Sequence, residues 1–410
     1  MTIGTNWAGY HEYAATTLHR PTTIEQLQEV VAAAPKIRAL GTRHSFNDIA
    51  DSAELVTLEG FDADIRIDDD SETVSLSSGV PYGVLAAALQ VEGWALRNMG
   101  SLPQISVGGA ISTSTHGSGD RNGTLARAVS GLEIVTADGS LRTISPADDE
   151  FDGAVVSLGA LGVVTRVTLD IEPSYLVRQD VYAGLTWPRL LEHYDAITSR
   201  AYSVSIFTNW VDDTRNTVWL KSRMDERTPP QELYGAAPLG DDVRLAEGEE
   251  SNTTQQGGVP GPWNERIPHF KMGFTPSNGD ELQTEYLVPR RHALDAMRAV
   301  RELGPQIAPH LHITELRTMA ADSLWLSGAY DTDATAIHFT WKNEPPAVLA
   351  LLPVIEAALE PFDARPHWGK LFHSVLRELY PRLDDFVALA HDFDPGGKFR
   401  NSFLDRHVFQ

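Results

Sequence analysis

The sequence predicts an α+β protein with two domains. Its 410 residues exceed the size at which one hydrophobic core stops growing, so a second domain is the default expectation. Hydrophobic residues make up 42% and charged residues 22%, which is the balance of an ordinary globular chain. Strand and helix patterns alternate before Pro173, and a second group of strands and helices follows a Pro- and Gly-rich stretch.

The first helix is predicted by its capping residues. Thr23 and Gln26 fit a capping box, the apolar residues that follow recur at helical spacing, and Pro35 ends the helix. A short apolar strand at residues 37–40 runs directly into Gly41. Further strands are expected at residues 55–58, 65–67 and 74–76, and a second helix follows Pro81 and stops near Gly93.

Residues 98–119 are small, polar and rich in Gly, Ser and Thr. A flexible linker would have this composition, but the stretch also contains Ile105, Val107 and Ile111, which are residues of the buried type. It is also flanked by good strands. We therefore interpret it as a loop that cradles a ligand.

A hairpin with a two-residue turn is expected next, with strands at residues 132–136 and 141–144 around Asp138-Gly139. Residues 163–171 alternate apolar and polar side chains, as a strand with one buried face requires. Glu172-Pro173 ends this strand and is the first predicted domain boundary. In the second region, residues 228–262 predict a loop. Strands are expected there at 282–287, 314–318 and 336–341, and helices at 289–303 and 346–359.

The charge balance argues against two classes of partner. With 33 basic and 56 acidic residues the net charge is −23, which disfavours nucleic acid and anionic membranes and favours solubility. No apolar run is expected to reach the ~18 residues of a membrane span, and no signal peptide is visible. The absence of cysteine excludes disulfides and thiolate metal sites. A cytoplasmic protein is expected.

Several common motifs are missing from the sequence. It contains no dinucleotide-binding G-x-G-x-x-G after a strand, no P-loop, no G-x-S-x-G elbow and no zincin motif. His310 and His312 lack a third ligand, so we interpret them as structural and predict no metal site. By contrast, the loop Gly41–Asp48 directly follows a strand, and its small residues allow a diphosphate to approach the backbone.

These motifs together resemble the vanillyl-alcohol-oxidase type of FAD-linked oxidases, and within it the alditol (xylitol/sorbitol) oxidases. The matching segments follow the family's order along nearly the whole chain: residues 41–48, 98–119, 157–164, 258–263, 315–318, 338–341, 365–370 and 394–399. The resemblance implies a two-part FAD-binding domain with an inserted α+β cap domain. The expected division is residues 1–173 for the FAD domain, 174–370 for the cap, and 371–410 for a tail that returns to the FAD domain.

The resemblance also implies that His44 bonds covalently to FAD through a ring nitrogen. Because cysteine is absent, the double His-plus-Cys linkage of some relatives is impossible, and a single link is expected. Val163 matches a position whose backbone meets the adenine side, and His367 resembles a residue near the flavin ring. The other implied cofactor contacts are Leu40, Gly41, Thr42, Arg43, Ser45, Gly100, Ser101, Ser106, Gly109, Ala110, Ile111, Ser112 and Thr113.

Substrate contacts implied by the resemblance are Ser101, Glu315, Arg317, Thr340 and Lys370, with His338 beside them. Glu315 and Arg317 are two apart on a strand and so share a face, as do His338 and Thr340. A plain surface ion pair would explain Glu315 and Arg317 alone. Two such strands and a lysine favour a polyol pocket, because hydroxyls need many directed hydrogen bonds.

For the chemistry we expect hydride transfer from a polyol carbinol to flavin, with O2 as second substrate. Lys370 and Arg317 are the candidates to hold the reacting hydroxyl, and Glu315, Ser101 and Thr340 to hold the others. Which group accepts the hydroxyl proton stays open. Gly100 would flank the flavin; its missing side chain either leaves space for O2 or serves backbone conformation.

Two alternatives remain at this stage. One is an aldonolactone oxidase or dehydrogenase, because those relatives share the covalent histidine and a His-Trp-x-Lys end. The other is a flavin-binding protein without turnover, against which the intact Lys370, Arg317 and Glu315 argue. Relatives of this size suggest a monomer.

Overall fold

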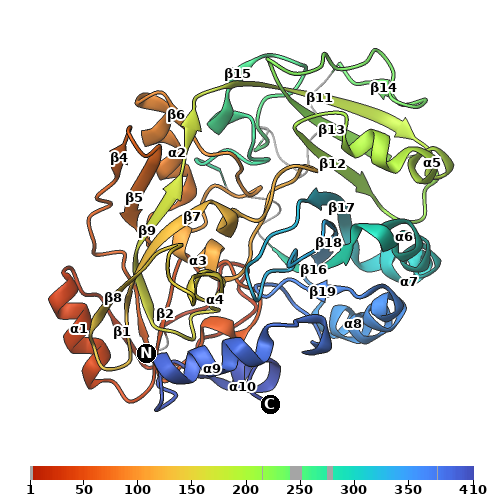
Figure 1. Ribbon diagram of the computed structural model, residues 1–410. Coiled ribbons are helices and arrows are strands. Elements are labelled where there is room, and N and C mark those ends of the chain that lie inside the picture. Colours follow the sequence, from red (N-terminus) through yellow and green to blue (C-terminus); the bar gives the residue numbers. More distant parts are fainter. Residues whose placement is uncertain (1–2, 215, 241–251, 275–279, 376) are drawn as a thin grey trace.

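The computed structural model describes residues 3–214, 216–240, 252–274, 280–375 and 377–410. Within these ranges the strands form four sheets, of three, two, five and nine strands. The two larger sheets dominate the arrangement: the five-stranded sheet belongs to the N-terminal part, and the nine-stranded sheet lies on the opposite side of the molecule (Figure 1). The mixture confirms the predicted α+β class.

The three-stranded sheet is parallel and carries the first predicted loop at its end. Its order is β1 (Thr17–His19), β3 (Glu54–Val56) and β2 (Ile37–Ala39). Thr23 is the N-cap of helix α1 (Ile24–Ala33), and its side chain accepts a hydrogen bond from the Gln26 N–H, as predicted. The capping box is nevertheless incomplete, because the Gln26 side chain accepts from the N–H of Thr22 instead of that of Thr23.

The five-stranded sheet has the order β4-β5-β9-β7-β8. Its strands are β4 (Arg66–Asp68), β5 (Thr73–Ser77), β9 (Val163–Asp170), β7 (Val129–Val135) and β8 (Leu141–Ile144). The hairpin β7–β8 is confirmed, but its two-residue turn is wrong. Thr136 and Ser140 still pair, which leaves a three-residue loop, and Gly139 takes the positive φ that such a loop needs.

Two helices pack on this sheet, α2 (Tyr82–Val91) and α3 (Val107–Ser112), and α4 (Phe151–Val155) lies nearby. Helix α3 corrects the expectation of a pure loop over residues 98–119. Its sequence is poor in helix formers, but Val107, Ala110 and Ile111 are buried in the core, and this packing stabilises the short helix. Strands β6 (Trp94–Ala95) and β10 (Glu172–Pro173) form a small separate ladder.

The nine-stranded sheet has the order β14-β11-β13-β12-β17-β18-β16-β19, with β15 paired to β11. The expected strands are confirmed as β16 (Glu281–Pro289), β17 (Leu311–Met319) and β18 (Ala334–Lys342). The sequence analysis missed β11 (Leu176–Leu185), β12 (Ser203–Thr208), β13 (Asn216–Arg223) and β19 (Arg365–Pro366). Strands β14 (Ala237–Pro238) and β15 (Gly261–Pro262) interrupt the loop predicted at 228–262, of which residues 241–251 lie outside the described residues.

Helices cover one side of this sheet and enclose a second core. They are α5 (Trp187–Thr198), which was also missed, α6 (Ala293–Glu302), α7 (Gly304–Ile307) and α8 (Pro345–Leu359). Helices α9 (Leu383–Phe393) and α10 (Ser402–His407) pack instead into the core of the five-stranded sheet, beside the N-terminal elements (Figure 1). This arrangement supports the division at residues 173 and 370, which stays a prediction.

Helix α8 corrects one expectation about apolar segments. With the turn that follows it, Pro345–Phe362 forms an 18-residue helix of mean hydropathy 1.4, which is long and apolar enough to cross a membrane by length and composition. The high hydropathy arises because its outer face carries Leu349 and Val354, both exposed, while Val348 and Leu352 are buried in the second core. Core helices of globular proteins pass the same test.

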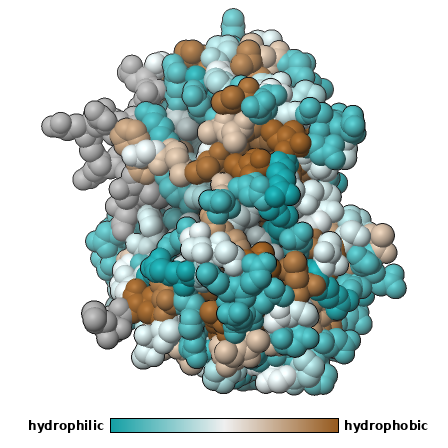
Figure 2. Space-filling view, turned by 90° about the vertical axis from the view of Figure 1, so that its left-hand side faces the viewer, coloured by the Kyte–Doolittle hydropathy of each residue, from teal (hydrophilic) through white to brown (hydrophobic). Residues whose placement is uncertain are grey.

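The surface is consistent with the large excess of acidic residues. Figure 2 shows one face, which is mainly hydrophilic, with hydrophobic residues in separate patches and the largest of them in the upper half. Such patches are normal on folded chains.

Candidate active site

A cavity of about 260 Å³ lies where the two glycine-containing loops face the nine-stranded sheet. One wall consists of the loop after β2 and of residues 100–116. The opposite wall consists of side chains from β12, β16, β17 and β18, and Lys370 and His367 close it from the segment after β19. The sequence thus brings together both predicted loops and both predicted polar strands.

The two loops approach each other as closely as glycine permits. A Cβ atom on Gly41 would lie 2.6 Å from Ser106 Oγ, and one on Gly109 would lie 2.9 Å from the same oxygen. The Ser106 N–H donates to Thr42 Oγ1 at 3.1 Å and so ties the loops together. A side chain is therefore excluded at Gly41 and at Gly109, which leaves the backbone groups of both glycines open to a ligand, as a diphosphate requires.

His44 has one ring nitrogen available. Its Nδ1 lies 3.1 Å from Thr42 Oγ1, whereas its Nε2 is buried and has no hydrogen-bond partner among the described residues. Burial, and then the nearby charge of Lys370, lower the pKa of His44 to about 4. The imidazole is therefore neutral at pH 7 and keeps a lone pair for bond formation. Both features fit the expected FAD.

The polar side chains of three adjacent strands form one surface of the cavity. Glu315 on β17 is paired with His338 on β18, which is paired with Glu285 on β16. Two residues further along these strands, Thr340 on β18 is paired with Gln283 on β16. The prediction that Glu315 shares a face with Arg317, and His338 with Thr340, is confirmed, because all four line the cavity. The third polar pair, Gln283 and Glu285, was missed.

Glu285 is the centre of the buried charges. Its Oε1 accepts a hydrogen bond from Arg317 Nη2 at 2.7 Å and lies 3.1 Å from His116 Nε2, and its Oε2 lies 3.4 Å from His338 Nδ1. Burial alone would raise the pKa of Glu285, but Arg317 and the histidines hold it well below its ordinary value. The carboxylate is therefore ionised and orients Arg317.

Glu285 also forms a group with two histidines that could hold a metal ion. The nearest ligand atoms of Glu285, His116 and His367 lie within 4.8 Å of one another. The guanidinium of Arg317 already supplies positive charge to this carboxylate. The expectation that the chain holds no metal stays a prediction.

Lys370 is held next to the His44 loop. The Phe46 N–H donates to Gly369 O at 2.8 Å, and Asn47 Nδ2 donates to Lys370 O at 2.7 Å. The ammonium donates to Gln283 Oε1. Burial lowers the pKa of Lys370 to about 8; Glu285 opposes this change and Arg317 adds to it. Lys370 is consequently a cation at pH 7 that titrates near the physiological range.

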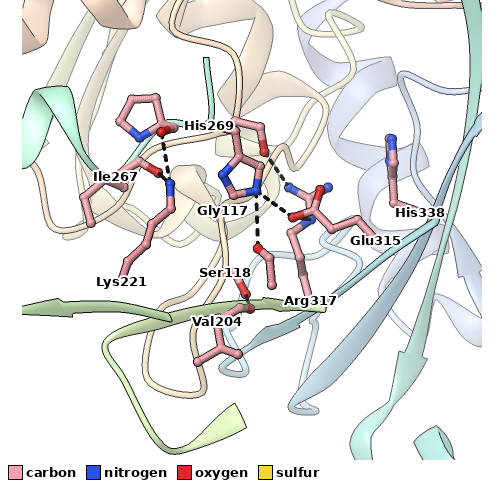
Figure 3. A network of polar contacts seen from close by, with 12 residues as sticks. Gly117, Ser118, Val204, Lys221, Ile267, His269, Glu315, Arg317 and His338 are labelled. Carbon is pink, nitrogen blue, oxygen red and sulfur yellow. Dashed lines mark hydrogen bonds and ion pairs between the residues drawn. The ribbon is translucent and has the colours of Figure 1, made fainter. Parts of the chain in front are cut away.

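His269 is a cavity residue that the sequence analysis missed. Its Nε2 lies 2.8 Å from Glu315 Oε1, and burial lowers its pKa to about 4, so the neutral ring donates to the carboxylate. Figure 3 shows this imidazole directed at Glu315. Behind it, the buried Lys221 donates hydrogen bonds to the carbonyls of Arg266, Ile267 and Pro268 at 2.9, 2.6 and 3.0 Å.

Most predicted site residues line the same cavity. The exceptions are Ile111 and Val163, whose side chains are buried in hydrophobic clusters, so only their backbones are available to a ligand. Ser101 Oγ lies 3.4 Å from Arg317 Nη1, which places it with the substrate group. Further missed lining residues are His116, Phe207, His269, Phe270, Gln283, Glu285 and Ile313.

Comparisons with known proteins agree with this geometry. A family model described as an FAD binding domain matches residues 15–145, and one described as D-arabinono-1,4-lactone oxidase matches residues 277–407. Alditol oxidase of Streptomyces sp. (strain IKD472 / FERM P-14339) is 47% identical over 98% of both chains. L-gulono-1,4-lactone dehydrogenase of Mycobacterium tuberculosis is 29% identical, also over 98% of each.

Among solved structures, cholesterol oxidase from B. sterolicum superposes with a TM-score of 0.80 at 14% identity, covering 99% of this chain and 96% of that one. This likeness confirms the expected FAD-binding fold. The identity to alditol oxidase extends over nearly the whole length. The chain therefore belongs to the alditol oxidase family, FAD-dependent oxidoreductases with a fold of the vanillyl-alcohol-oxidase type.

Proposed function

We propose that this protein oxidises a terminal hydroxyl of an alditol such as xylitol or sorbitol to the aldose, while O2 is reduced to H2O2. The observation that carries the proposal is the cavity itself. Its one wall consists of the two glycine-containing loops and His44, and its opposite wall presents Glu315, Arg317, Thr340 and other polar side chains. A linear polyol offers a hydroxyl on every carbon and needs such a row of donors and acceptors.

FAD would be held covalently by His44 alone. The unpartnered Nε2 and the neutral state of the ring support attachment, and the absence of cysteine leaves a single link. When bound, FAD accepts a hydride from the carbinol carbon and passes two electrons to O2. His44→Ala should abolish covalent flavin; flavin that still migrates with this variant on a denaturing gel would refute the assignment.

The protein residues would orient the substrate and stabilise charge. Lys370 and Arg317 would donate to the reacting hydroxyl and stabilise its developing negative charge. Glu285 holds Arg317 for this role, and Gln283 holds Lys370. Glu315, Ser101 and Thr340 would bind the remaining hydroxyls and so determine which carbon faces the flavin.

A peroxide assay over xylitol, sorbitol, glycerol and gulonolactone tests the substrate class. Peroxide from the polyols and little from the lactone is the expected result. The reverse preference would favour an aldonolactone oxidase, which the match of residues 277–407 to the lactone oxidase model keeps open. Flavin that no substrate reduces would point to a flavin-binding protein without turnover.

We further propose a cytoplasmic monomer that acts on small molecules and binds neither nucleic acid nor membrane. The net charge of −23 supports the exclusion of polyanions. A sedimentation experiment would test the oligomeric state.

A further inference from the structure

The segment of residues 3–13 folds over the loop that carries His44. It closes on itself through the Asn6 N–H, which donates to His11 O at 2.8 Å, and the Tyr13 N–H, which donates to Gly4 O at 3.2 Å. Asp51 anchors the chain just after this segment, because its carboxylate accepts from the Ala14 N–H at 3.1 Å. We call this segment the strap.

The strap contacts three consecutive residues of the loop. The Trp7 N–H donates to Arg43 O at 2.8 Å, and Asn6 Nδ2 donates to Ser45 O at 2.9 Å. Between them, the Trp7 ring stacks on the His44 imidazole with centroids 5.6 Å apart and planes inclined by 21°. The strap therefore holds His44 and the residues on either side of it.

The backbone of the loop needs such support. Arg43 has a φ of 62°, in the left-handed region that non-glycine residues rarely adopt. Its guanidinium donates back to Ile3 O in the strap at 3.0 Å. Asn6 is 4% exposed, and its Oδ1 accepts from the N–H groups of Tyr10 and His11, so its side chain is rigidly placed.

We infer that the strap positions the His44 imidazole for covalent attachment of FAD, with Trp7 and Asn6 as positioning residues. The inference rests on the proposed attachment at His44. In that reaction a bond forms between the imidazole nitrogen and the 8α carbon. One N–H and one C–H bond break, and the two protons and two electrons pass to O2 as H2O2. Because the imidazole nitrogen must be held within reach of the 8α carbon for this bond to form, attachment requires the ring to stay in one orientation.

The test measures covalent flavin per chain in purified protein, as fluorescence on a denaturing gel and as intact mass. Trp7→Leu removes the stacked ring, and Asn6→Ala removes the donor to Ser45 O. Each should slow attachment after addition of FAD by on the order of tenfold, while FAD stays bound without a covalent link. Trp7→Phe, which retains a ring, should attach FAD faster than Trp7→Leu.

Trp94→Leu is the matched control, because Trp94 is also half-buried but packs against the core of the five-stranded sheet and donates to Asp69, away from the His44 loop. This variant should attach FAD as the wild type does. Results are expressed as the covalent fraction of all bound flavin, so reduced yield of a variant does not affect them. Wild-type attachment rates in both Trp7→Leu and Asn6→Ala would overturn the inference. Wild-type protein without covalent flavin would instead overturn attachment at His44, and the strap inference with it.

Discussion

His269 Nε2 lies 2.8 Å from Oε1 of Glu315, and the side-chain nitrogen of Lys221 donates to carbonyls of the loop that carries this histidine. The backbone N–H of His269 also donates to Ser101 O at 3.2 Å. One short segment therefore contacts two of the proposed substrate-binding residues. Because Lys221 is fully buried and satisfies three carbonyls, the segment cannot shift without leaving those groups unpaired.

His269→Leu should weaken substrate binding more than it slows the chemical step. The variant removes a donor to a carboxylate, which is worth about 1.5–3 kcal/mol, so the dissociation constant for xylitol should rise at least about tenfold. Anaerobic stopped-flow reduction of the flavin separates this constant from the limiting rate. His269→Gln, which keeps a donor, should be affected less. An unchanged dissociation constant in His269→Leu would contradict the assigned role.

Glu285→Gln should move the titration of Lys370. Glu285 raises the pKa of Lys370 against the effect of burial, so its neutralisation should lower that pKa further below about 8. If protonated Lys370 supports flavin reduction, the fall in the reduction rate at alkaline pH should therefore occur at a lower pH than in the wild type. Removing one partner of a buried ion pair also costs about 3–5 kcal/mol, so the melting temperature should fall. A melting curve and the pH profile check both effects, and an alkaline limb at its wild-type position would contradict the electrostatic coupling.

Much of the site was predictable because strands alternate. Glu315 and Arg317 alternate with Leu316, and His338 and Thr340 alternate with apolar residues. The structure puts both of these polar pairs in the cavity. Strand β16 carries the same signal in Gln283 and Glu285. It was overlooked because the strand is buried on both faces and was identified by its apolar residues.

Other features depend on packing that a single sequence does not reveal. All six residues of β12 are buried, although three of them are Ser or Thr, so the sequence of this short strand does not show that both of its faces are covered. Lys221 looks like any surface lysine, and its burial depends on the carbonyls of a segment 45 residues away. The contact of Trp7 with His44 joins two loops, for which no periodic pattern exists.

The pH dependence of flavin reduction should identify the role of Lys370. Its pKa is lowered to about 8, so it is protonated below that pH and neutral above it. If the ammonium stabilises the developing alkoxide, reduction should be fastest below pH 8 and should slow as the pH rises through it. A rate that increases through pH 8 would instead make Lys370 the base. In Lys370→Ala the rate of flavin reduction should no longer change around pH 8 and should be about 10²–10³-fold lower, while the FAD spectrum is retained.

Gly100→Val should slow reoxidation of the flavin by O2 while leaving anaerobic reduction by xylitol comparatively intact. Gly100 lines the cavity, and its φ is not in the left-handed region, so the backbone does not require glycine there. A Cβ atom would lie 3.6 Å from Ile105 Cδ1 and 3.8 Å from His116 O, which are ordinary contacts. Gly100→Ala should therefore fold normally and show a smaller effect. The two half-reactions are measured separately by stopped flow, and an artificial acceptor should restore turnover. Reoxidation at the wild-type rate in both variants would mean that O2 reaches the flavin by another path.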